Sequence, residues 1–183
     1  MKNFSRTNLI FSLCGLNCGL CPMKLGGYCP GCGGGAGNQT CVIARCSFQH
    51  DHVEYCFLCP EYPCSRYSNI DPYDSFLTHQ GQLRDIERAR EIGIEAYNNQ
   101  LSKRIQILEQ LLSDYDDGRS KTFYCLAMNL LPLPEIEILL ERTINENAFI
   151  DLPVKEKCRQ ITGQFKELAQ QQGILLKLRK KGS

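Results

Sequence analysis

The chain has 183 residues, which is enough for one domain of ordinary size or two small ones. Its hydrophobic fraction of 43% is that of a globular protein, and its formal net charge of +1 gives no reason to expect nucleic acid or an anionic membrane as a partner. No stretch approaches the roughly 20 apolar residues of a membrane-spanning helix, so no such helix is predicted.

No export signal is predicted from the first residues. The apolar run of residues 9–11 is broken by Ser12 and leads directly to Cys14, so it is shorter than the roughly 7–15 residues of a signal-peptide core. Leu13 also stands where a lipoprotein signal requires a small residue. We therefore expect a cytoplasmic protein, in which cysteines stay reduced and bind metal in preference to forming disulfides.

Cysteine is the strongest signal in the composition. Ten of the twelve cysteines lie within the first 64 residues, and six of these ten form three C-x-x-C pairs. This spacing lets two thiolates of one tight turn bind the same metal ion. We therefore predict that residues 1–74 form a metal-binding module. The predicted ligands are its ten cysteines: Cys14, Cys18, Cys21, Cys29, Cys32, Cys41, Cys46, Cys56, Cys59 and Cys64.

The same segment is poor in regular structure. Residues 33–37 are four glycines and one alanine, which cannot hold a helix or an ordered strand. We predict short turns, one or two brief strands near residues 9–13 and a helical turn around residues 42–46. A segment of this kind buries little apolar area per residue, so bound metal would supply the stability that a small core lacks.

The clearest metal-binding element is residues 29–33, Cys-Pro-Gly-Cys-Gly, which has the zinc-knuckle pattern. In such a turn backbone N–H groups face the thiolate sulfurs and disperse the net negative charge of four thiolates around a divalent ion. Two closed sites would use eight cysteines, whereas three would also need His50 and His52. In an extended segment both of these rings would face the same side, but we favour the simpler interpretation of two surface histidines in a polar loop.

Closed sites of paired C-x-x-C turns suit zinc, and two or three Zn²⁺ ions are the leading prediction. A 4Fe-4S cluster is the alternative, because Cys14, Cys18 and Cys21 have the C-x3-C-x2-C spacing that holds the cluster of radical SAM enzymes. Those enzymes use a large barrel, which this chain is too short to form. A dithiol redox centre is a lesser hypothesis, since no βαβ pattern surrounds any C-x-x-C pair.

The order of the cysteine groups resembles a known family. The resemblance is carried by residues 14–22 (CGLNCGLCP), 29–32 (CPGC), 41–46 (CVIARC) and 56–64 (CFLCPEYPC). Together they resemble the domain-of-unknown-function family numbered 3795, found in bacteria and archaea, over about residues 10–80. The resemblance implies a metal-binding module and no particular reaction. Many relatives carry a further cysteine shortly before the position of Cys41, and this chain has none there.

Residues 75–183 have the periodicity of helices. Apolar residues recur at helical spacing over residues 83–92 and 96–112, with Gly93 as a break between the two runs. Residues 116–118, Asp-Asp-Gly, predict a turn.

Three further helices are expected towards the end of the chain. One runs over residues 121–131, one begins at Pro134, and the last begins at Pro153 and continues to about Gln172, with Gly173 as its C-cap. The predicted fold class is therefore mainly α. It comprises a small irregular metal-stabilised cysteine-rich module, residues 1–74, and a C-terminal bundle of four or five helices, residues 75–183.

Several residues outside the cysteine module are candidates for other roles. His79 would orient a ligand or act as an acid or base, although a polar residue at a helix start is the simpler interpretation. The polar cluster of residues 116–121 is an anion or partner site, or more simply a solvated turn. Cys125 and Cys158, set among apolar helical residues, are interpreted as small buried hydrophobes.

The combined prediction is a metal-binding protein that serves binding or regulation, with a protein or small ligand as its partner. No catalytic residue is predicted, because closed all-thiolate shells leave no position for a catalytic water. One alternative is an iron–sulfur protein for electron transfer or redox assistance, with Cys14, Cys18 and Cys21 at three corners of one cluster. A second alternative is metal or thiol trafficking, in which surplus cysteines exchange a ligand with a partner.

Overall fold

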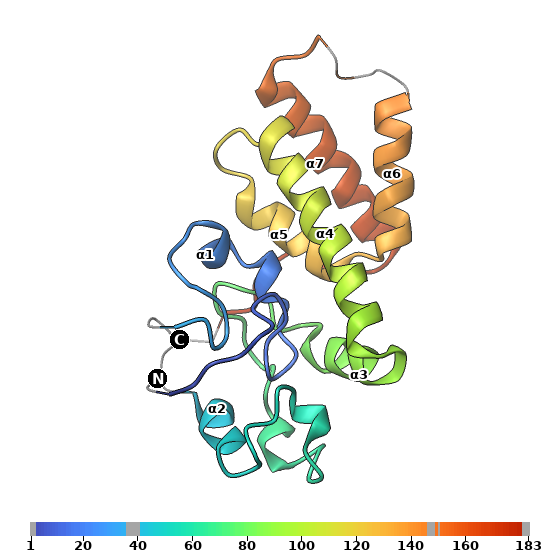
Figure 1. Ribbon diagram of the computed structural model, residues 1–183. Helices are drawn as coiled ribbons and strands as arrows, with labels where there is room; N and C mark the ends of the chain where they lie inside the picture. Colours follow the sequence, from blue (N-terminus) through green and yellow to red (C-terminus); the bar gives the residue numbers. More distant parts are fainter. Residues whose placement is uncertain (1–2, 36–40, 146–148, 150, 181–183) are drawn as a thin grey trace. The chain divides into compact units, whose positions relative to one another are not determined.

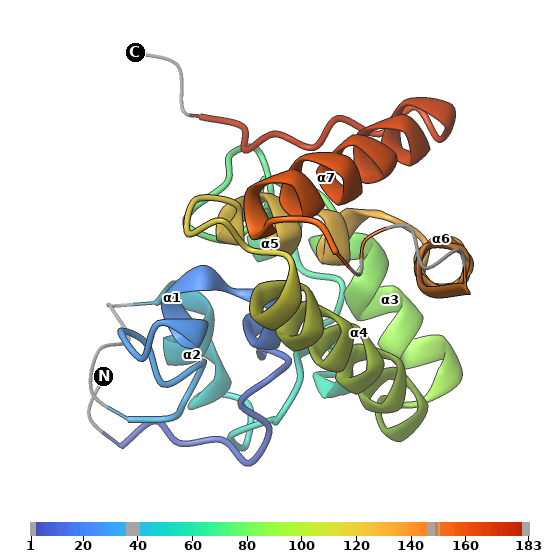
Figure 2. The ribbon, with the colours of Figure 1, turned by 90° about the horizontal axis from the view of Figure 1, so that it is seen from above.

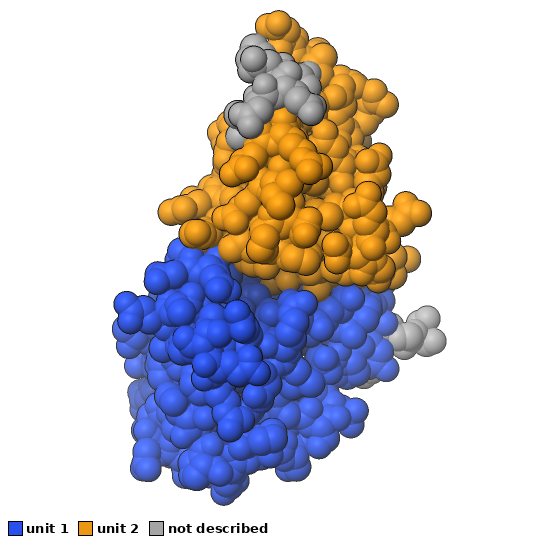
Figure 3. All heavy atoms as spheres, turned by 90° about the vertical axis from the view of Figure 1, so that its right-hand side faces the viewer, with its two compact units in different colours: residues 1–102, 178–183 blue, residues 103–177 orange. Residues whose placement is uncertain are grey.

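The computed structural model describes residues 3–35, 41–145, 149 and 151–180 (Figure 1). Within these residues the protein is mainly helical and has no β-strand, so the predicted mainly-α class is confirmed. The chain divides into two compact units, drawn in different colours in Figure 3. Unit 1 comprises residues 1–102 and 178–183, and unit 2 comprises residues 103–177.

The cysteine-rich part of unit 1 consists of loops and single helical turns. The α-helices α1 and α2 are both short here (Figure 2), and three 3-10 turns, η1 to η3, complete the segment. The predicted helical turn around residues 42–46 is confirmed as α2. The bounds are η1 Cys18–Leu20, α1 Pro22–Leu25, α2 Val42–Ser47, η2 Cys56–Leu58 and η3 Ser65–Tyr67.

The strands expected near residues 9–13 are not found, and that prediction was wrong. The backbone there bonds to loops instead of to a neighbouring strand. The carbonyl of Ile10 accepts the N–H of Gly19 (2.8 Å), and the carbonyl of Leu13 accepts the N–H of Cys56 (2.9 Å). Backbone polar groups that are shielded from water need partners, and turns that double back on the segment supply them here without a sheet.

A small apolar cluster lies between these loops. Its buried side chains are Phe4, Leu13, Ile43 and Ala44, which come from the N-terminal segment and from α2. Cys14, Cys32, Phe48, Val53, Cys56 and Ile70 pack against it and are partly buried. Three of the predicted ligands therefore lie at the edge of a core too small to stabilise the segment strongly by burial alone.

Helix α3 (Gln82–Ile92) and the beginning of α4 (Ile94–Asp114) belong to unit 1. A buried polar network joins them to the cysteine-rich loops. Asn17 Nδ2 donates to Asp85 Oδ2 (2.8 Å), and the hydroxyl of Tyr97 donates to Asn17 Oδ1 (2.9 Å). Unit 1 thus extends past residue 74, where the composition changes, because side chains of both helices complete the hydrogen bonding of the loops.

Unit 2 is a bundle of residues 103–114 of α4 with α5 (Lys121–Leu130), α6 (Leu133–Asn145) and α7 (Val154–Gln171). These bounds confirm the three helices predicted towards the end of the chain, and Gly173 adopts the positive φ of 65° that a residue just past a helix end favours. The fully buried side chains of the bundle include Leu108, Tyr124, Met128, Ile136, Ile161 and Phe165.

Two sequence interpretations outside unit 1 are also supported. Cys125 and Cys158 are buried in the bundle, as expected for small apolar side chains. In the loop before α5, the Asp116 carboxylate accepts the N–H groups of Gly118 (3.1 Å) and Ser120 (3.0 Å). This carboxylate therefore shapes its own turn, as the turn interpretation of the polar cluster implies.

The end of the chain returns to unit 1 through an ion pair. The Asp74 side chain is fully buried, and its carboxylate accepts the backbone N–H of Arg179 (2.7 Å), the Arg179 guanidinium (3.0 Å) and the N–H of His79 (2.7 Å). Burial alone would raise the pKa of the Asp74 carboxyl, but the bonds from Arg179 and His79 outweigh it and lower the pKa.

We expect Asp74→Asn to lower the free energy of unfolding of unit 1 by about 2 kcal/mol at neutral pH, since it removes an acceptor charge from several hydrogen bonds. The Arg179 side chain is 37% exposed, so the cost stays below that of breaking a fully buried pair. Because the folded carboxyl has the lower pKa, the stabilisation is complete above the unfolded value of about 3.9 and is lost as the pH falls through the folded value.

Urea unfolding followed by amide NMR signals of unit 1, at about pH 7 and about pH 3, measures this difference. The gap between the native protein and Asp74→Asn should narrow at the lower pH. Asp71→Asn is the matched control, because Asp71 offers Arg179 its backbone carbonyl (2.7 Å), which the substitution keeps. Equal destabilisation by the two substitutions would contradict a specific role for the Asp74 carboxylate.

Candidate metal centre

All twelve cysteines lie among the described residues, and all are free thiols. The ten predicted ligands are in unit 1, and each of them except Cys41 is partly buried. Their arrangement was not predictable from their spacing. Two sets of four are described below, one around Cys18 and one lining a cavity. Cys14 interacts with Cys32 of the first set and with Cys56 of the second.

The first cysteine group comprises Cys18, Cys21, Cys29 and Cys32. Cys18 begins η1, Cys21 lies between η1 and α1, and the other two lie in the loop after α1. Burial raises the pKa of the Cys18 thiol to about 12; an N–H from Cys32 opposes this, and the thiols of Cys32, Cys21 and Cys29 raise it further. The thiols of Cys21, Cys29 and Cys32 are thus near enough to Cys18 to act on its charge.

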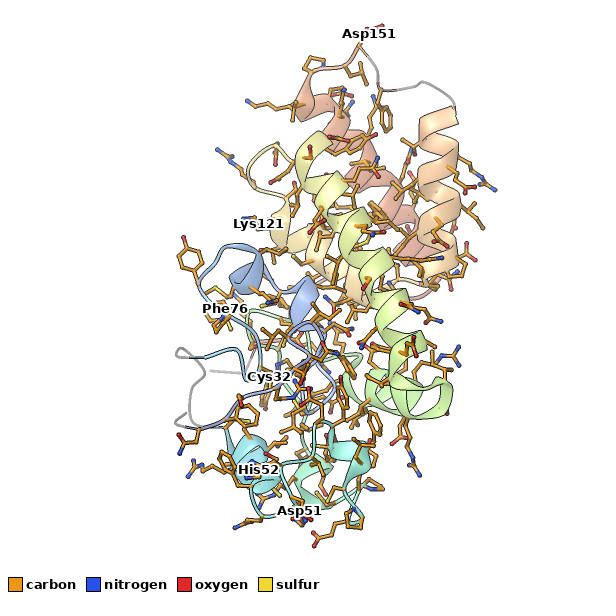
Figure 4. All side chains as sticks on the ribbon, viewed as in Figure 1. Cys32, Asp51, His52, Phe76, Lys121 and Asp151 are labelled. Atoms are coloured by element: carbon orange, nitrogen blue, oxygen red, sulfur yellow. The ribbon has the colours of Figure 1, made fainter. Side chains whose placement is uncertain are left out.

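The zinc-knuckle turn has the backbone arrangement that its sequence predicts. Gly31 has a φ of 99°, a conformation that glycine adopts without steric cost, and its N–H points at Cys29 Sγ (3.5 Å). The Cys32 N–H bonds to the Cys18 sulfur. In Figure 4, Cys32 lies in the interior of unit 1. Two backbone donors thus already face sulfurs of the first cysteine group.

Arg6 is a buried cation that acts on Cys32 of this group, and no sequence pattern marks it as part of a site. Its side chain is 2% exposed, and its Nη2 lies 3.3 Å from Glu54 Oε1. Its Nη1 donates to the carbonyls of Asn8 (3.1 Å) and Phe11 (2.9 Å). A charge this well buried has to be compensated from several sides.

The guanidinium of Arg6 also acts on a predicted ligand. Burial raises the pKa of the Cys32 thiol, while an N–H from Leu13 and then the charge and hydrogen bond of Arg6 oppose that rise. Arg6 therefore favours the thiolate form of Cys32. Cationic and N–H partners of this kind around a ligand stabilise the negative charge that a thiolate metal site accumulates.

The second cysteine group comprises Cys46, Cys56, Cys59 and Cys64, which come from α2, the two ends of η2 and the start of η3. Together they line one cavity of about 30 Å³. Burial raises the pKa of the Cys56 thiol to about 11; the nearby Tyr67 hydroxyl opposes this, and the thiols of Cys64, Cys46 and Cys59 add to the rise. The lining of the cavity and the charge interactions of Cys56 thus both include these four residues.

The two histidines near this cavity differ in position. His50 forms part of the cavity wall, with Nε2 3.9 Å from Glu61 Oε2. His52 is exposed and packs edge-on against Phe48, with ring centroids 4.8 Å apart. The segment is not extended, because Asp51 and His52 have φ values of 53° and 54°, and Figure 4 places both away from Cys32. The alternating arrangement that would have aligned the two rings does not occur.

The Cys14 thiol interacts with members of both groups, and the Cys41 thiol acts on Cys14 and Cys32. Burial raises the pKa of the Cys14 thiol, Ser12 opposes this, and the thiols of Cys32, Cys41 and Cys56 raise it further. The strongest electrostatic neighbours of Cys14 are thus not Cys18 and Cys21, its partners in the C-x3-C-x2-C spacing. His79, the remaining candidate, bonds to the Ser75 hydroxyl (3.1 Å) ahead of α3.

The cysteines of each group do not yet have the geometry of metal ligands. Among the described residues, no three side chains of histidine, cysteine, aspartate or glutamate converge on a point from which they would hold an ion as they stand. The donor chemistry nevertheless fits a thiophilic divalent ion, since each group offers four thiols and Zn²⁺ takes four ligands. Small rotations of the cysteine side chains are the adjustment that such binding requires.

No protein-family model matches the chain, and no curated protein and no solved structure matches it. Membership of family 3795 therefore stays a prediction. Among the described residues no helix has the length and apolar character needed to cross a membrane.

The knuckle turn provides a test of the local architecture. A Cβ at Gly31 would meet the Leu9 carbonyl oxygen at 2.6 Å, and φ is positive there, so Gly31→Ala combines a backbone clash with conformational strain. Gly27 also has positive φ (74°) but open space around it. We expect Gly27→Ala to cost about 1 kcal/mol and Gly31→Ala at least about 3 kcal/mol in the free energy of unfolding of unit 1.

Amide NMR signals of unit 1, followed through urea unfolding, measure both substitutions. The difference between the two unfolding free energies measures the clash of the added Cβ with the Leu9 carbonyl, because both substitutions share the strain of a positive φ. A cost for Gly31→Ala no larger than that for Gly27→Ala would show that the knuckle turn has room the structure does not indicate.

Proposed function

We propose that the chain is a metal-binding protein, that unit 1 holds structural Zn²⁺ through its cysteines, and that the protein serves binding or regulation in the cytoplasm. One observation carries the proposal. The fold gathers eight cysteines, spread over residues 18–64, into two groups of four free thiols. Apolar packing does not require this, because thiols distributed through the small core would fill space equally well.

The surroundings of the first cysteine group suit a metal ion held by thiolates. Four thiolates around Zn²⁺ leave two net negative charges, which need nearby donors. The N–H groups of Gly31 and Cys32 and the cation of Arg6 lie where such donors are needed. In this proposal Cys18, Cys21, Cys29 and Cys32 hold the ion, and the ion cross-links η1 to the loop after α1.

A structural role also suits the composition of the segment. Described residues up to the start of α3 contain two short α-helices, three 3-10 turns and one small apolar cluster. The entropy of ordering a loop-rich chain is large, and burial of so few side chains offsets little of it. Bound metal would couple its binding free energy to folding, as in other small thiolate-ligated modules.

An iron–sulfur protein for electron transfer remains the alternative. It would place Cys14, Cys18 and Cys21 around one cluster. The thiols that act on Cys14 are those of Cys32, Cys41 and Cys56, so Cys14 lends this arrangement no support. The partner we propose is a protein or a small ligand, and no reaction is assigned.

Metal analysis of protein purified without air decides between the two. For zinc we expect about two ions per chain by mass spectrometry and no visible absorption. Iron with inorganic sulfide and a broad band near ~400 nm would instead establish a cluster. Protein that binds neither metal after reconstitution would reject the proposal.

The coupling of metal to folding has its own test. We expect Cys29→Ser/Cys32→Ser to lose about one zinc per chain and to lose the dispersed amide signals of unit 1 around the first cysteine group, because the cross-link is gone. Far-UV circular dichroism should keep most of its helical signal, since the bundle of unit 2 contains none of these cysteines.

Cys125→Ala is the matched control. It also removes a thiol, but from the buried face of α5, and should leave the zinc content unchanged. Unchanged zinc content and intact unit 1 signals in Cys29→Ser/Cys32→Ser would remove this pair from the ligands.

A further inference from the structure

We propose that Cys46, Cys56, Cys59 and Cys64 form a second and separate site for a thiophilic divalent ion, and that this site exchanges its ion with the solvent whereas the first cysteine group does not. The inference rests on the proposed function, because it requires that unit 1 binds metal. It adds which cysteines share an ion and assigns the two ions different roles.

The cavity is the first support. Its volume of about 30 Å³ is enough for one particle of the size of a water molecule or a metal ion. The four thiols reach its wall from α2, η2 and the residue that precedes η3. An ion there would join three short elements that few other contacts hold together.

A buried hydroxyl is the second and independent support. Tyr67 is 7% exposed and lines the cavity, and its hydroxyl is left without a hydrogen-bond partner among the described residues. The Cys56 sulfur belongs to the wall of the same cavity. A buried hydroxyl without a good acceptor is costly, and a metal-bound thiolate is a stronger acceptor than a thiol.

The second cysteine group has a route to solvent. An open cleft of about 560 Å³ borders the cavity and shares Tyr62, Cys64 and Tyr67 with it. The rest of its wall includes Glu87 of α3, which accepts the Tyr62 hydroxyl (2.6 Å). Cys64 thus borders both the cavity and the cleft, so a competing ligand in the cleft can reach the ion by displacing Cys64.

The hydrogen bonding of the sulfurs also indicates that the second cysteine group releases its ion faster than the first. Backbone N–H groups of Gly31, Cys32 and Leu13 bond to sulfurs of the first cysteine group. At the second cysteine group the corresponding donor is a side-chain hydroxyl, that of Tyr67. Outer donors of this kind change metal affinity by about 10–100-fold, so the first ion should be released more slowly. An exchangeable thiolate site suits the transfer or sensing of a thiophilic ion.

Zinc release from the full-length zinc-loaded protein into an excess of a chromogenic chelator tests this directly. We expect two phases of equal amplitude, each about one zinc per chain, with rates at least about tenfold apart. Cys46→Ser/Cys59→Ser should bind one zinc and lack the fast phase. Tyr67→Phe should keep both ions and accelerate the fast phase alone, since it removes the hydroxyl and leaves the ring.

Pulse alkylation of the native sequence avoids any dependence on variant folding. After the fast phase, iodoacetamide should modify the second cysteine group, with Cys64 first, and leave Cys18, Cys21, Cys29 and Cys32 protected. Modification of the first group at that time, or a fast phase that persists in Cys46→Ser/Cys59→Ser, would overturn the inference. Two zinc ions released in a single phase would refute it while leaving the proposed function intact, whereas a protein that binds no zinc would refute both.

Discussion

One buried guanidinium holds the N-terminal loops together. Arg6 donates to the carbonyls of Asn8, Phe11 and Glu54 and pairs with the Glu54 carboxylate. In a unit without strands among its described residues, these carbonyls have no neighbouring strand to supply an N–H, so a side chain with five donors takes that place. Because the same cation lies beside Cys32, the interaction that orders the loops also sets the electrostatics of the first cysteine group.

The remaining polar network positions the cysteines against rigid elements. Asn17 immediately precedes Cys18, and its amide is held by Asp85 of α3 and Tyr97 of α4. The side chain of Gln82, at the start of α3, donates to the Cys14 carbonyl (3.0 Å). Buried networks of this kind favour one arrangement because any displacement leaves a polar group unpaired. The loops that carry the thiols are therefore anchored to helices.

The two cysteine groups differ in their surroundings, and this difference organises the functional hypothesis. One has backbone N–H donors and a buried cation around its sulfurs, which suits a permanent cross-link. The other surrounds a cavity beside an open cleft and has a tyrosine hydroxyl as its donor. A single module would thus combine a site that maintains the fold with one that responds to its environment.

The sequence by itself determined the helices, because apolar periodicity acts over a few residues. Local spacing also determined the helical turn at α2 and the zinc-knuckle turn of the N-terminal segment, because C-x-x-C turns are equally local. Only the tertiary structure decided which cysteines are neighbours, since Cys46 and Cys64 meet through loops whose course no local pattern encodes. It also decided that residues 9–13 bond to loops, and that the Arg6 side chain is buried. Long-range hydrogen bonds stabilise these arrangements of the loops, and their partners lie too far apart in the sequence to be predicted from it.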